Sequence, residues 1–69
     1  MDEQATKIGE AAGALWSALE GKAEGLSLAQ LKTKTGLGAE LLNQAVGWLA
    51  REDKIGFQGS GKTLKLILK

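Results

Sequence analysis

The spacing of apolar residues along this 69-residue chain changes once, from helical to alternating. Up to about residue 52 they recur every three or four positions, which is typical of helices that bury one face. After that point they alternate with other residues, which is typical of half-buried strands. The pattern therefore predicts an α+β fold in which helices come first and a β-hairpin comes last.

Three helices are predicted, and their expected ranges are about residues 5–20, 28–35 and 39–52. The second begins at a capping box, in which Ser27 and Gln30 each accept a backbone hydrogen bond from the other. Gly36 ends it, because glycine readily adopts the left-handed conformation found at helix C-termini. A tight turn over residues 36–38 leads into the third helix, so the last two helices form a helix-turn-helix pair.

The first predicted helix has an apolar stripe and, beside it, a face with two glycines and a tryptophan. The stripe consists of Ile8, Ala12, Leu15 and Leu19. The neighbouring face carries Gly9, Gly13 and Trp16. Because glycine costs about 1 kcal/mol in a helix interior, this face predicts the close approach of another backbone. That backbone belongs either to the same chain or to a second copy, and the sequence leaves both alternatives open.

The segment GFQGSGKT, residues 56–63, matches the letters of a phosphate-binding loop. Such a loop needs a helix that starts near its lysine and directs its N-terminus at the phosphates. The residues after Thr63 alternate instead, so we predict strands over about 54–58 and 63–68 with a glycine turn between them. No nucleotide is therefore expected as a partner.

The composition argues against several classes of function. The sequence has no cysteine, histidine or tyrosine, so the usual metal ligands and general bases are missing. We expect no enzymatic activity, no catalytic residues, no metal and no cofactor. The sequence has no apolar run of the roughly 20 residues that a membrane span needs, and no basic region at its start, so a cytoplasmic location without membrane contact is expected.

Two stretches of the sequence resemble a known family. IGEAAGALW, from Ile8, followed by AVGWLAREDKI, from Ala45, is similar to a family of small bacterial winged helix-turn-helix domains catalogued without assigned function. The longer run LLNQAVGWLAREDKIGF resembles the second motif helix and wing entry of winged-helix regulators. The resemblance covers residues 8–68 and implies a three-helix core, a hairpin wing and a short extra strand near residues 25–27. It also implies a superfamily that mostly binds DNA.

On such a fold the second helix of the motif enters the major groove of double-stranded DNA, so its exposed polar residues are candidate base contacts. Asn43 and Gln44 fit adenine edges, and Arg51 fits guanine or a phosphate. The candidate phosphate contacts are Lys32, Lys34, Lys54, Lys62, Lys65 and Lys69. Glu40, near the start of the same helix, repels phosphates. The candidate base and phosphate contacts are equally suited to an ordinary solvated surface. Weak, salt-dependent binding is therefore expected.

The alternative function is a protein-interaction or homodimerisation module that does not bind DNA. Its candidate surface consists of Gly9, Gly13, Trp16, Leu41 and Ile67. Gly47, by contrast, is expected to leave packing space for Trp48 or for the first helix. A two-fold dimer would also present two recognition helices, so dimerisation does not decide between the two functions.

Overall fold

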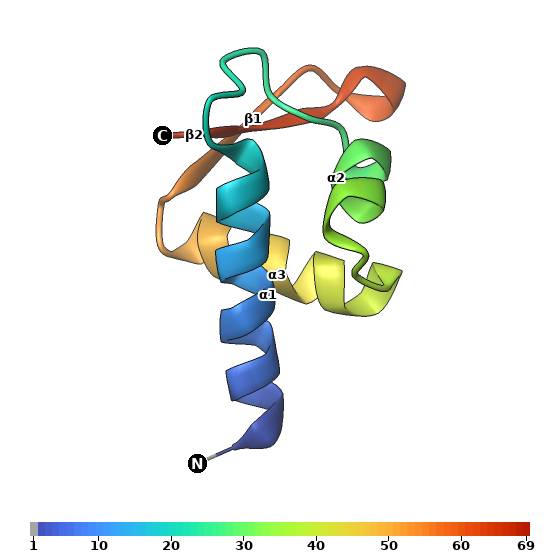
Figure 1. Ribbon diagram of the computed structural model, residues 1–69. Coiled ribbons are helices and arrows are strands. Elements are labelled where there is room, and N and C mark those ends of the chain that lie inside the picture. Colours follow the sequence, from blue (N-terminus) through green and yellow to red (C-terminus); the bar gives the residue numbers. More distant parts are fainter. Residues whose placement is uncertain (1) are drawn as a thin grey trace.

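A computed structural model describes residues 2–69, in which three helices precede a two-stranded antiparallel sheet (Figure 1). The helices are α1 (Glu3–Leu19), α2 (Leu28–Thr35) and α3 (Ala39–Arg51), and the strands are β1 (Ile55–Gln58) and β2 (Lys65–Leu68). One turn of 3₁₀-helix, Gly61–Thr63, lies between the two strands. This order confirms the predicted α+β winged helix-turn-helix fold.

Hydrogen bonds between near neighbours in the chain set the helix starts. The carboxylate of Asp2 accepts a hydrogen bond from the backbone N–H of Gln4 at 3.0 Å, so α1 begins before the expected residue 5. At the start of α2 the capping box is present in both directions. The Ser27 N–H donates to the Gln30 side chain at 2.9 Å, and the Gln30 N–H donates to the Ser27 hydroxyl at 3.1 Å.

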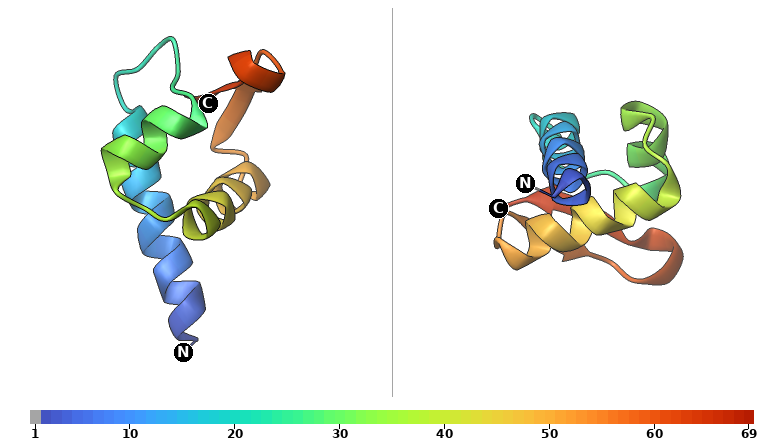
Figure 2. Two further views of the ribbon diagram at one scale, coloured as in Figure 1. Left: turned by 90° about the vertical axis from the view of Figure 1, so that its right-hand side faces the viewer. Right: turned by 90° about the horizontal axis from the view of Figure 1, so that it is seen from below.

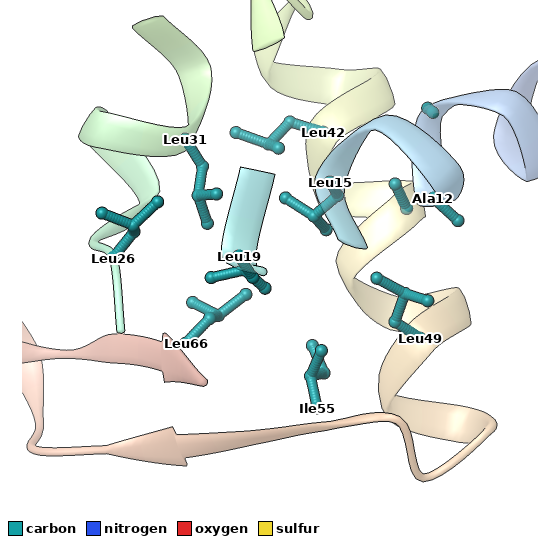
Figure 3. Close-up of a cluster of buried hydrophobic side chains, with 11 residues drawn as sticks. Ala12, Leu15, Leu19, Leu26, Leu31, Leu42, Leu49, Ile55 and Leu66 are labelled. Atoms are coloured by element: carbon teal, nitrogen blue, oxygen red, sulfur yellow. The ribbon is translucent and has the colours of Figure 1, made fainter. Parts of the chain in front are cut away.

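The hydrophobic core lies where the three helices meet the inner face of the hairpin (Figure 3). The buried residues are Ala11, Ala12, Leu15, Leu19, Leu26, Leu31, Leu42, Ala45, Leu49, Ile55 and Leu66. Three of them are alanines on α1 and α3, and their small side chains let these two helices pack closely. Each element contributes only one apolar face, so no helix could bury its stripe without the others.

A segment between α1 and α2 joins the sheet beside β2. Leu26 donates its N–H to the Leu66 carbonyl at 3.0 Å, and Leu66 donates its N–H to the Leu26 carbonyl at 2.8 Å. The extra strand expected near residues 25–27 is therefore a single bridge. Gly25 permits it, because its φ is +80° and a Cβ at this position would lie 2.5 Å from the Leu66 carbonyl oxygen.

The segment GFQGSGKT forms the end of the hairpin. In the register of the sheet, Ile55 pairs with Leu68 and Gln58 pairs with Lys65. The Thr63 hydroxyl donates to the Ser60 carbonyl at 2.9 Å, which stabilises the 3₁₀ turn. Because that turn occupies Gly61–Thr63, β2 begins later than the expected residue 63. A strand follows the turn, so these letters lack the helix that a phosphate-binding loop requires.

Replacing Gly25 by alanine should lower the free energy of unfolding by more than about 2 kcal/mol. The left-handed backbone alone costs about 1–2 kcal/mol for a residue with a Cβ, and the added methyl group would collide with the Leu66 carbonyl. Gly36→Ala is the matched control, because Gly36 has a similar φ of +72° but a Cβ there would face open space. Urea unfolding followed by circular dichroism measures both, and equal losses would contradict the close approach at Gly25.

Candidate functional site

The outer face of α3 lies opposite the core. Its residues are Glu40, Asn43, Gly47, Ala50 and Arg51, and all are exposed. A Cβ built at Gly47 would have no atom of α1 within 4 Å, which corrects the expectation that this glycine makes room for that helix. The middle of the outer face therefore has no side chain, and two side chains that can bond bases, Asn43 and Arg51, remain on it.

Gln44 lies apart from Asn43, with which the sequence pattern grouped it. Gln44 is half-buried, and its Oε1 accepts a hydrogen bond from Nε2 of Gln4 at 3.1 Å. Neighbouring residues on a helix differ by about 100° around its axis, so Gln44 points toward α1 when Asn43 points outward. The structure therefore separates these two candidate base contacts.

The candidate phosphate contacts are distributed around α3, with α2 and the hairpin on different sides of that helix (Figure 2). Lys32, Lys34, Lys54 and Lys62 are exposed, and Lys65 is half-buried. The ammonium group of Lys69 pairs with the carboxylate of Asp53, which neutralises part of its charge. Within residues 2–69 this is the one ion pair, so the other lysines have no carboxylate partner.

A second surface, which we call the tryptophan surface, consists of Gly9, Gly13, Trp16 and Trp48. Trp16 is 40% exposed and Trp48 is 44% exposed, and both rings line one shallow hollow between α1 and α3. A Cβ at either glycine would have nothing within 4 Å. An added methyl group at either glycine would therefore point into the open hollow and would not touch another element.

Leu41 and Ile67, which were expected to be exposed interaction residues, are both half-buried. Leu41 packs against the core. Ile67 covers Gly25, since its Cγ2 lies 2.6 Å from the position of a Cβ there. Neither residue belongs to the tryptophan surface.

The sequence pattern missed one exposed aromatic side chain, that of Phe57 on β1, which is 50% exposed. Its alternating position suggested a buried residue, because Ile55 on the same face of the strand is buried. No signal in the local sequence distinguishes Phe57 from Ile55, because both occupy alternating positions of one strand.

A metal site and a membrane-spanning helix are two further features that would indicate a function. Between residues 2 and 69, no three acidic side chains gather closely enough to hold a metal ion. None of the described helices has the length and apolar character needed to cross a membrane. The outer face of α3 and the tryptophan surface therefore remain as the candidate functional surfaces, together with the edge of the hairpin near Phe57.

Comparison with known proteins gives the family. A family model described as "Winged helix-turn-helix domain (DUF2582)" matches residues 1–68. An uncharacterized protein of Methanocaldococcus jannaschii is 43% identical over 56 residues, which is 80% of this chain and 80% of that protein. A solution NMR structure of a protein from Bacteroides thetaiotaomicron is similar with a TM-score of 0.77 and 35% identity, covering 91% of this chain and 76% of that chain. The chain therefore belongs to the DUF2582 family of winged helix-turn-helix domains.

Proposed function

We propose that this domain binds double-stranded DNA weakly, mainly through the phosphates. On a winged helix, α3 can lie in the major groove while α2 and the hairpin reach the flanking backbone. The observation that carries the proposal is that the lysines around α3 are mostly unpaired. Among residues 2–69, only Lys69 is paired with a carboxylate. Ammonium groups without a partner in the protein are free to replace the counterions of phosphates.

Sequence discrimination is expected to be small. Asn43 and Arg51 are the base-contacting candidates on the outer face of α3, and Gly47 between them offers no side chain. Glu40 lies near the start of the same helix and repels phosphates. Because phosphate contacts position a protein without reading bases, affinity should depend on salt more than on sequence.

The tryptophan surface favours a second function, which is self-association. Two helical glycines cost about 1 kcal/mol each, and no described part of the chain uses the space that they leave. The first turns of α1 also project beyond α3 (Figure 1), where residues 2–7 are exposed. A two-fold interface is self-complementary, so Trp16 of one copy could cover the glycines of the other.

Neutralising two phosphate-contacting lysines should weaken DNA binding and reduce its salt dependence. For Lys32→Gln with Lys62→Gln, the slope of log K against log salt should fall by about 2, because each lost contact removes about one unit. Backbone amide spectra recorded during titration with a mixed-sequence duplex measure both quantities. Lys69→Gln is the control, because Lys69 is already paired with Asp53. If wild-type spectra did not change with DNA at low salt, the DNA proposal would fail.

Replacing Asn43 by alanine should change the preference between DNA sequences and leave the salt slope unaltered. The amide of Asn43 is suited to adenine edges, and it carries no charge. Competition between duplexes of different sequence measures the preference. Gln44→Ala provides the comparison, because Gln44 is bonded to Gln4 and should leave the preference unchanged. Equal effects of the two substitutions would contradict the separation of these residues.

Gly13→Ala should stabilise the monomer and oppose self-association. In dilute protein the methyl group faces open space, so the free energy of unfolding should rise by about 0.5–1 kcal/mol. At high concentration the same methyl group should hinder a second copy and shift sedimentation toward the monomer, as should Trp16→Ala. Gly47→Ala is the matched control, because it should stabilise similarly without affecting association. A wild-type protein that remains monomeric at millimolar concentration would rule out this second function.

A further inference from the structure

Among residues 2–69, no strand pairs with the outer edge of β1. In an antiparallel sheet the N–H and C=O of one residue point to the same side, and successive residues alternate between sides. Leu66 uses both groups to bond Leu26, at 3.0 and 2.8 Å, so they point away from β1. Phe57 lies directly opposite Leu66. Its N–H and C=O therefore point away from β2, toward the outer edge.

A second hydrogen bond supports the same alternation. The N–H of Lys69 donates to the carbonyl of Lys54 at 3.0 Å. In an antiparallel pair, hydrogen-bonded and non-bonded residue pairs alternate. Starting from the bonded pair of Lys54 and Lys69, the next bonded pair is Gly56 with Ile67, so the pair of Phe57 and Leu66 is not bonded. Within residues 2–69, Phe57 makes no backbone hydrogen bond to any loop or turn.

The sequence of β1 does nothing to block this edge. Exposed edges usually carry a charged residue or proline, which discourages the addition of another strand. The residues of β1, IGFQ, include neither. The ring of Phe57 beside the edge is 50% exposed. An extended backbone is the ligand whose donors and acceptors match such an edge.

The side chains beside the edge indicate the chemistry of the added strand. A residue paired with Phe57 would place its side chain on the face of that half-exposed ring, where an apolar group packs well. On the opposite face the stem of Lys69 crosses Gly56, with its Cε 3.6 Å from a Cβ built there, and its ammonium group pairs with Asp53. Lys54, which is bonded to Lys69 through the backbone, is exposed and has no carboxylate partner among residues 2–69. Residues of the added strand that alternate with the apolar ones would lie on this face, where Lys54 supplies the unpaired positive charge, so an acidic side chain fits there.

We propose that the free edge of β1 binds an extended segment of another protein, in which apolar and acidic residues alternate. The segment adds antiparallel to β1 and forms two hydrogen bonds with the backbone of Phe57. Its apolar residue packs on the Phe57 ring, and its acidic residue faces Lys54. This activity does not use the outer face of α3, and it shares Lys54 with the candidate phosphate contacts and with the border of the tryptophan surface.

The probe is a blocked seven-residue peptide of alternating glutamate and valine, compared with a lysine and valine peptide of the same length. The glutamate peptide should shift the Phe57 amide signal and slow its hydrogen exchange, and it should bind about tenfold more tightly than the lysine peptide. Equal binding of the two peptides, or no effect at the Phe57 amide, would overturn the proposal.

Two variants separate the backbone contact from the charge contact. Phe57→Pro removes the outward N–H, which a proline on an edge strand can do without loss of a ladder hydrogen bond, and should abolish binding. Lys54→Glu changes an exposed side chain and should reverse the preference between the two peptides, so it remains informative if the proline variant unfolds. Lys34→Glu on α2 is the control and should leave the preference unchanged.

A second copy of this chain is the competing occupant of the edge. Without peptide, hydrogen exchange of the Phe57 amide should be fast and independent of protein concentration. Protection that grows with concentration would show that another copy covers the edge, and it would overturn the proposal of a separate peptide partner.

Discussion

Leu66 holds the hairpin to the helices by its side chain and by its backbone. Its side chain is fully buried, next to Leu19 in the core (Figure 3), and its N–H and C=O both bond Leu26. Because these two groups bond Leu26 at the edge of β2, the opposite residue of β1, Phe57, directs its own N–H and C=O to the other edge of the sheet. The interaction that closes the core therefore also leaves the edge of β1 open.

The candidate surfaces differ in how they respond to salt. At physiological ionic strength the Debye length is about 8 Å, so exposed lysines on separate elements act on a ligand almost singly. The free energy gained by burying an indole ring does not come from charges, so salt does not screen it. DNA binding through Lys32 and Lys62 is therefore expected to be strongest at low salt, whereas association through Trp16 and Trp48 should persist at higher salt.

The fold could be predicted largely because its determinants are local. The capping box of Ser27 and Gln30 and the stop at Gly36 involve residues close in the chain, and the structure contains both. The cap at Asp2 follows the same physics but was not expected, since the apolar stripe begins only at Ile8. The candidate site was less predictable, because periodicity gives the angle of Gln44 around α3 and not the position of its partner Gln4 on α1.

The sequence by itself determined the order of the elements and the hairpin character of GFQGSGKT, because periodicity and turn chemistry act between near neighbours. Only the tertiary structure decided which flanking residues face solvent. A Cβ built at Gly13 or Gly47 would meet open space, and Phe57 is 50% exposed although Ile55 on the same face of β1 is buried. Exposure at the flank of a helix or the end of a strand depends on where the neighbouring elements stop, and no local pattern contains that information.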